Sequence, residues 1–222
     1  MEYLLSFSVG AILGDIFFHL IPESLDSHLM EFNDSPGVAQ RKVGSSIIAG
    51  ILLFIIVEMI LETTQILISS KMIDPAGYLN LIANGCDNFT HGLAIGASFL
   101  VGPKVGLLTT FVIFIHEIPH EICDYAILVN SGFSRWDAVK AQSSVSLFGI
   151  MGTATALYVK SVETLNARTV WILPFSAGGF LHIALVNLLP EILSRETNFR
   201  GAVEQIACVI LGIAFMGAVA QA

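Results

Sequence analysis

Charged residues are scarce in this chain. Asp, Glu, Lys and Arg make up 13% of its 222 residues, whereas hydrophobic residues make up 55%. Its mean hydropathy of +0.78 lies above that of ordinary water-soluble domains. The scarcity of charge excludes a water-soluble globule. The ten Lys and Arg residues are spread over many connections, so we expect the lipid bilayer, and no nucleic acid, among the partners.

Cysteine is also sparse, and a targeting segment is not evident. Cys86, Cys123 and Cys208 are an odd number in apolar segments, which predicts no disulfide framework. Because the N-terminus lacks a basic region and a small-residue cleavage site, we expect no cleaved signal peptide. Lys and Arg divide evenly between the two sets of alternating connections, so the charge bias does not orient the chain in a membrane.

The chain does contain apolar segments long enough to cross a membrane. About 20 helical residues span the ~30 Å hydrocarbon layer. Seven such segments predict an all-α polytopic membrane protein with one transmembrane domain over residues 1–222. The expected spans are roughly 4–22, 45–68, 78–101, 105–129, 138–159, 171–193 and 201–221, and the longest connection is near 23–43.

An internal repeat relates the first and sixth spans. At an offset of 168, FSVGAILGDIFFHLIPESL (7–25) aligns with FSAGGFLHIALVNLLPEIL (175–193), including a shared glycine and Pro-Glu ending. Spans five apart cross in opposite directions, so the pair predicts a helical bundle with inverted repeats, typical of transporters. Convergence of two apolar helices is the alternative. Only the later copy has a helix before it, so we expect one helix to be missing from the start.

Polar residues gather on the third and fourth spans. Ionisable groups inside hydrocarbon are costly and are retained mostly for function. Helical spacing groups them into neighbouring faces, and mixed imidazole and carboxylate donors suit Zn²⁺ and related divalent metals. For any single residue, a helix–helix hydrogen bond is the alternative. The candidate residues are Asp87, Asn88 and His91 on the third span and His116, Glu117, His120, Glu121 and Asp124 on the fourth.

Other polar side chains lie on the flanking spans. Pro119 removes a backbone hydrogen bond within the fourth span and predicts a kink beside the metal face. Residues on the first, fifth and sixth spans are expected to flank the path as relay or supporting groups. These are Asp15, His19, Gln142, His182 and Asn187, and Asp124 of the fourth span is expected to act with them rather than as a metal ligand.

An enzyme is a competing interpretation. His116-Glu117-Ile118-Pro119-His120 matches HExxH, in which two histidines bind Zn²⁺ and the glutamate activates water. An intramembrane metalloprotease would use this pattern. Against it, the proline distorts the turn, and the donor cluster on the preceding span has no role in such an enzyme. We therefore do not expect an enzyme; cleavage of a membrane substrate that depends on Glu117 would discriminate the two.

The motifs resemble those of the ZIP (Zrt-, Irt-like protein) family of divalent-metal transporters. HEIPHEICDYAIL is similar to the HExPHE motif that defines one subfamily, and DNFTHGLAIGASFLV and LLSFSVGAILGDIFFHLIPE resemble its fourth and second helices. Asp87, where many relatives have His, is similar to the branch of endoplasmic reticulum and Golgi membranes. Cys123 replaces the usual glycine and leaves metal selectivity open.

The resemblance implies a 3+2+3 helical bundle, seen here without its first helix, and a homodimer. It also implies Zn²⁺ movement from the lumen or outside into the cytosol, with Fe²⁺ or Mn²⁺ as alternatives and no permanent cofactor. A non-transporting regulatory partner of a full-length transporter is a further alternative. By motif, the implied transport-site ligands are Asp87, Asn88, His91, His116, Glu117 and His120, with Glu121 close by.

Overall fold

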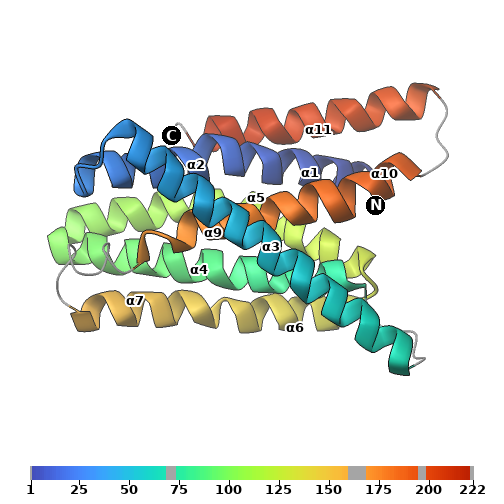
Figure 1. Ribbon diagram of the computed structural model, residues 1–222, viewed down its shortest axis with the longest axis horizontal. Coiled ribbons are helices and arrows are strands. Elements are labelled where there is room, and N and C mark those ends of the chain that lie inside the picture. The colour runs from blue at the N-terminus through green and yellow to red at the C-terminus, as the bar shows by residue number, and fades with distance from the viewer. Residues whose placement is uncertain (1, 69–73, 160–168, 195–198, 221–222) are drawn as a thin grey trace.

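The protein is a bundle of long helices (Figure 1). The computed structural model describes residues 2–68, 74–159, 169–194 and 199–220, which contain no strand. This confirms the predicted all-α polytopic fold class. The α-helices are α1 (Glu2–Asp15), α2 (Ile21–Asp26), α3 (Pro36–Ile68), α4 (Pro75–Val101), α5 (Pro103–Asn130), α6 (Arg135–Val145), α7 (Leu147–Val159), α9 (Ile172–His182), α10 (Leu189–Ser194) and α11 (Phe199–Val219). Three π-helical segments complete the chain path: η1 (Ile16–Leu20), η2 (Ser27–Glu31) and η3 (Ile183–Leu188).

All seven predicted spans are helical in the described residues, and five helical segments meet the length and hydropathy expected of a membrane crossing. The third and fifth predicted spans do not meet these criteria, for separate reasons. Polar side chains lower the hydropathy of α4, and the fifth span is divided at Ser146 into α6 and α7. The qualifying segments are Glu2–Met30, Pro36–Thr64, Pro103–Asn130, Ile172–Ser194 and Phe199–Val219.

The long connection expected near 23–43 is largely helical instead. The first span continues through α2 and η2 to Glu31, and α3 begins at Pro36, since proline is well tolerated in a first helical turn. Between them, Asp34 accepts a hydrogen bond from Lys42 Nζ at 2.8 Å and lies 3.0 Å from His28 Nδ1. The Lys42 ammonium holds the pKa of Asp34 below its usual value. His28 therefore helps to fix the end of this helix pair.

The structure supports the predicted inverted repeat. Each copy changes from α-helix to π-helix and back, through η1 in the first copy and η3 in the second, at matching positions. Figure 1 shows α1 and α9 running in opposite directions. The matched glycines Gly10 and Gly178 both press against a neighbouring backbone. A Cβ atom on Gly10 would lie 2.0 Å from the Val209 carbonyl oxygen of α11, and one on Gly178 would lie 2.1 Å from that of Ile47 on α3.

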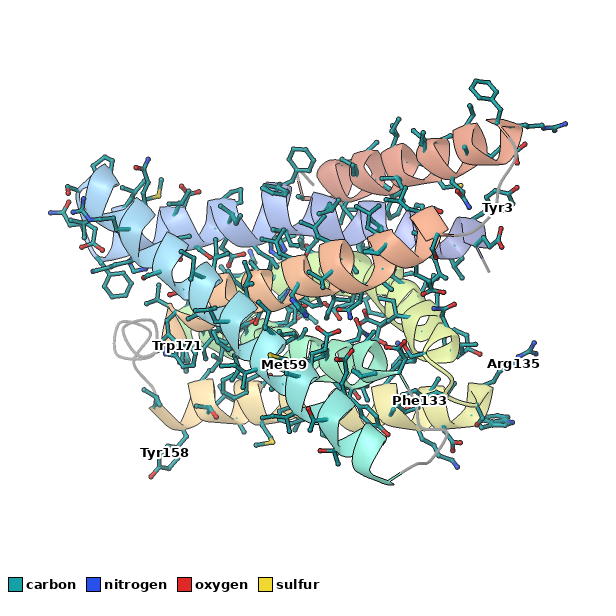
Figure 2. The ribbon with its side chains drawn as sticks, turned by 45° about the vertical axis from the view of Figure 1, so that its right-hand side comes forward. Tyr3, Met59, Phe133, Arg135, Tyr158 and Trp171 are labelled. Atoms are coloured by element: carbon teal, nitrogen blue, oxygen red, sulfur yellow. The ribbon has the colours of Figure 1, made fainter. Side chains whose placement is uncertain are left out.

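The apolar core lies between the two repeat copies. Its largest buried side chains include Leu5 and Ile16 from the first copy, Phe180 and Ile183 from the second, and Phe54 from α3. The remaining apolar side chains cover the outside of the bundle, where a bilayer would solvate them. Figure 2 shows Tyr158 pointing outward from its helix, and Met59 on α3 is likewise exposed. Their exposure is consistent with a membrane-embedded surface.

Helices α4 and α5 lie between α1 and α9 on one side and α6–α7 on the other (Figure 1). Small residues allow α4 and α7 to approach closely, as is common for helices in membranes. A Cβ atom on Gly92 would lie 2.0 Å from the Gly149 carbonyl oxygen, and one on Gly152 would lie 2.1 Å from that of Phe89. Helix α4 also packs against α5, which carries the other polar candidates.

Substitution Gly178→Ala should lower the thermal stability of the protein. The added methyl group has no room against the α3 backbone, and overpacking of this kind costs about 1–3 kcal/mol. Heat-induced loss of monodisperse protein in detergent would measure the change. Gly44→Ala is the matched control on α3, because no atom lies within 4 Å of its added Cβ. Equal stabilities of the two variants would contradict the close packing of α9 on α3.

Candidate metal centre

Three ionisable side chains meet between α4 and α5. Asp87 and His91 lie one helical turn apart on α4, and Glu117 faces them from α5. Their ligand atoms lie within 4.8 Å of one another. His91 Nδ1 is 2.6 Å from Glu117 Oε1 and 3.7 Å from Asp87 Oδ2. Asp87 and His91 are buried, whereas the Glu117 side chain keeps 20% of its surface exposed. The three side chains form the only group of this kind in the part of the chain that the structure describes.

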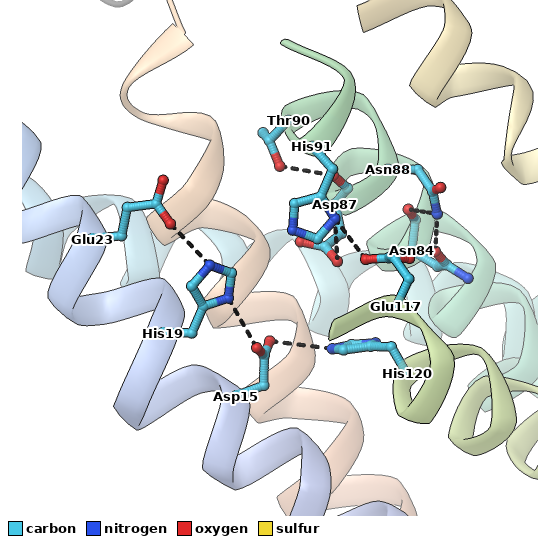
Figure 3. A network of polar contacts seen from close by, with 10 residues as sticks. All are labelled: Asp15, His19, Glu23, Asn84, Asp87, Asn88, Thr90, His91, Glu117 and His120. Atoms are coloured by element: carbon cyan, nitrogen blue, oxygen red, sulfur yellow. Dashed lines mark hydrogen bonds and ion pairs between the residues drawn. The ribbon is translucent and has the colours of Figure 1, made fainter. Parts of the chain in front are cut away.

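A second polar chain runs from α1 to this group (Figure 3). The buried Asp15 carboxylate lies between two histidines, 3.1 Å from His19 Nδ1 and 3.2 Å from His120 Nε2. His19 Nε2 lies 2.9 Å from Glu23 Oε2, which places Glu23 at the outer end of the chain. The sequence placed Asp15, His19 and His120 near the metal path, and the structure brings all three together.

The π-helical segment η1 aims His19 at the metal group. Its ring stacks on the ring of His91, with centroids 6.0 Å apart and planes inclined by 19°. A π-helical turn accommodates one extra residue and often occurs at functional sites. The matching segment η3 holds Asn187, at the position that corresponds to His19 in the repeat. Thus both repeat copies alter their helical geometry where a polar side chain must face inward.

Two other predicted ligands make hydrogen bonds outside the central group. The amide of Asn88 donates to the backbone and side-chain carbonyl oxygens of Asn84 on the same helix. Glu121 accepts a hydrogen bond from Gln142 Nε2 through its Oε2, at 2.7 Å, and its backbone oxygen accepts another at 2.8 Å. Gln142 therefore holds Glu121 toward α6, away from the group of Asp87, His91 and Glu117.

His116 and Asp124 complete the predicted set on α5. The backbone of His116 belongs to α5, but its side chain lies outside the described residues. Asp124 is 1% exposed and follows His120 by one turn. Pro119 lies within α5, as predicted, among these polar residues.

His182 and Asn187 form a separate cluster against α3. His182 Nε2 lies 2.6 Å from Glu58 Oε2, and the Asn187 amide donates to Glu58 Oε1 at 2.5 Å. The sequence analysis missed Glu58, although it is an ionisable residue inside an apolar span. The rule that such residues are functional or paired would have identified it. It also missed Asn84 and Asn80, which lie one and two turns before Asp87 on α4 and are both buried.

Polar cavities open toward the two ends of the α4–α5 pair. One, of about 340 Å³, reaches His91 and is lined by Glu23, Ser27 and Thr90. Another, of about 230 Å³, lies where α4 begins and α5 ends, and includes Asp74, Asn130 and Glu191 among its lining residues. The metal-binding candidates lie near the middle of both helices, between these cavities.

The geometry of the central group fits a divalent transition metal. Two ligands of a tetrahedral ion with bonds of about 2.0 Å lie roughly 3.3 Å apart, a value between the 2.6 Å and 3.7 Å that separate His91 Nδ1 from its two carboxylate neighbours. One imidazole and two carboxylates are donors that Zn²⁺, Fe²⁺ and Mn²⁺ accept. The two carboxylates would offset the charge of the ion, which a low-dielectric interior otherwise disfavours.

Comparisons with known proteins agree with these features. The sequence model described as "ZIP Zinc transporter" matches residues 64–220. The protein called Zinc transporter ZIP13 in Pongo abelii is 44% identical over 222 aligned residues, which cover 97% of this chain and 66% of the relative. Zinc transporter ZIP13 of Mus musculus is 39% identical, with coverage of 97% and 69%. The Zinc transporter ZIP13 homolog of Drosophila melanogaster is 37% identical, with coverage of 97% and 76%. The chain thus spans about two thirds to three quarters of the length of these relatives.

Substitution His91→Gln should weaken divalent-metal binding by at least about tenfold, since even supporting groups around a metal contribute 10- to 100-fold to affinity. The absorption of bound Co²⁺ would report the change during a titration. His28→Gln is the matched control, because His28 pairs with Asp34 at a helix end. If both variants bind Co²⁺ as the unsubstituted chain does, the central group is not a metal site.

Proposed function

The chain belongs to the ZIP zinc transporter family, and on this premise we propose that it carries Zn²⁺ across a membrane through the group of Asp87, His91 and Glu117. The observation that carries the proposal is the position of this group. It lies at mid-helix on α4 and α5, between polar cavities toward the two ends of that helix pair. An ion entering one cavity would exchange water for carboxylate and imidazole ligands before leaving through the other.

The cavity near Glu23 supplies one route to the site. Its lining includes His91 itself, and Glu23 contacts His19, whose ring stacks on that of His91. A cation that enters therefore meets carboxylate oxygen first and imidazole nitrogen next. Because a membrane interior stabilises ions poorly, such successive ligands are what a translocation path needs.

The metal preference follows from the donors. Imidazole favours Zn²⁺ over harder ions such as Mg²⁺ and Ca²⁺. Fe²⁺ and Mn²⁺ accept the same donors, so they remain alternative substrates. From the family motifs, Asn88, His116 and His120 are proposed as further ligands, with Glu121 close by. The proposed direction is from the lumen or outside into the cytosol, and the metal ion is cargo rather than a permanent cofactor.

We do not propose a protease, because Glu117 lies 2.6 Å from His91 on the neighbouring helix and is thereby part of a two-helix cation group. In an HExxH enzyme, the two histidines of one helix and one further carboxylate bind the metal, and the glutamate is left free to act as the general base. A regulatory subunit that transports no ion is the second alternative. It predicts an altered flux in a full-length partner and none from this chain alone.

Zinc flux in reconstituted vesicles tests the proposal. Zn²⁺ uptake should fall to the level of empty vesicles in a Glu117→Gln variant and in a His116→Ala/His120→Ala double variant, because both lose proposed ligands. A zinc-sensitive dye inside the vesicles would measure the rate. Glu204→Gln on α11 is the matched control, because Glu204 lines neither cavity and lies outside the central group. Undiminished flux in the double variant, or none from the unsubstituted chain, would overturn transport by this site.

The protein is a multi-pass integral membrane protein. By the resemblance to the HExPHE subfamily, endoplasmic reticulum or Golgi membranes are its proposed location, and a homodimer its proposed assembly. Cross-linking of two differently tagged copies in membranes should yield a mixed dimer. Recovery of each tag alone, under conditions that cross-link a known membrane dimer, would contradict the proposed assembly.

A further inference from the structure

On the side of the central group toward the end of α5, two buried polar side chains face each other between α4 and α5. Asp124 on α5 is 1% exposed and Asn80 on α4 is fully buried. Within the described part of the chain, neither carboxylate oxygen of Asp124 and neither polar atom of the Asn80 amide has a hydrogen-bond partner. The Asn80 amide nevertheless lies against the Asp124 carboxylate. A carboxylate buried against a neutral amide is strongly destabilising unless a cation or proton accompanies it.

The alignment of α4 with α5 places both residues at the same distance from the central group along the helix axes. Helices α4 and α5 are antiparallel neighbours, and Asp87 and Glu117 meet at one level. Asn80 precedes Asp87 by seven residues, and Asp124 follows Glu117 by seven. At about 1.5 Å per residue, both side chains therefore lie about 10 Å from the central group in the same direction.

The same direction leads to the second cavity. Asn130 lies six residues beyond Asp124 on α5, and Ala76 lies four residues before Asn80 on α4. Both line the cavity of about 230 Å³ that also holds Glu58 and Glu191. Asp124 and Asn80 thus lie between the central group and this opening. Glu121 lies on the same stretch of α5 but accepts a hydrogen bond from Gln142 of α6.

We propose that Asp124 and Asn80 form a second binding position for the transported divalent cation, between the central group and the cavity at Asn130. The proposal rests on the transport function proposed above. The carboxylate of Asp124 and the amide oxygen of Asn80 supply its protein ligands. Since imidazole is absent from this pair, the position holds Zn²⁺ less tightly than the central group and favours release. Oxygen donors also accept Mn²⁺ readily, so Mn²⁺ is a suitable probe.

Metal counting with substituted chains tests this position. Substitution Asp124→Asn keeps the size of the side chain and removes its charge. The purified variant in lipid nanodiscs should bind one Mn²⁺ fewer per chain than the unsubstituted protein at saturation, by equilibrium dialysis and electron paramagnetic resonance. Its Zn²⁺ flux should fall by about tenfold or more. Asp26→Asn, at an exposed carboxylate of α2, should change neither quantity.

A double variant separates cation binding from a structural role. Asn80→Asp combined with Asp124→Asn moves the carboxylate across the seam, and it should restore the lost Mn²⁺. An Asp124→Asn variant with the full count of Mn²⁺ would overturn the second position. So would a double variant that lacks the ion but still binds Co²⁺ through His91. Failure of transport itself has a different signature, namely flux that is insensitive to Glu117→Gln.

Discussion

A carboxylate in the interior of a membrane protein is stable only when a cation, a proton donor or a polar side chain compensates its charge, and the polar architecture of this bundle follows from that constraint. Asp15 lies between His19 and His120, Glu58 between His182 and Asn187, and Glu121 beside Gln142. Each cluster joins side chains from at least two helices, although Asp15 and His19 belong to the same span. The packing of the helices therefore also decides which side chains compensate each buried carboxylate.

Close backbone contacts supply the precision that these clusters need. Gly10 and Gly178 bring the two repeat copies against α11 and α3, while Gly92 and Gly152 bring α4 against α7. Small residues permit such approaches, and van der Waals packing then fixes the helices without a hydrophobic driving force between them. As a result, polar side chains on α1, α4 and α5 meet at distances of a few ångströms. The π-helical turns η1 and η3 adjust the direction of individual side chains within this rigid frame.

The central group and its flanking clusters suggest a division of tasks along the path. Glu23 and His19 lie toward one cavity, whereas Asn130 and Glu191 line the other, where they are joined by a hydrogen bond of 2.6 Å. The central donors include imidazole, and the pair of Asp124 and Asn80 offers only oxygen. A mixed-donor site followed by an oxygen site would bind a transition metal firmly and then weakly, as passage requires.

The sequence alone determined the all-α membrane fold and pointed to the inverted repeat and the three residues of the candidate metal group, because hydropathy, repeat spacing and the cost of buried charge can be read along the chain. It placed Asp87 and His91 on one face of a helix, since they are four residues apart. Only the tertiary structure decided which helices face each other. It joined Glu117 to His91, Asp15 to His120 and Glu121 to Gln142, contacts that no spacing predicts. It also revealed Glu58 and Asn80, whose importance depends on the neighbours that packing gives them.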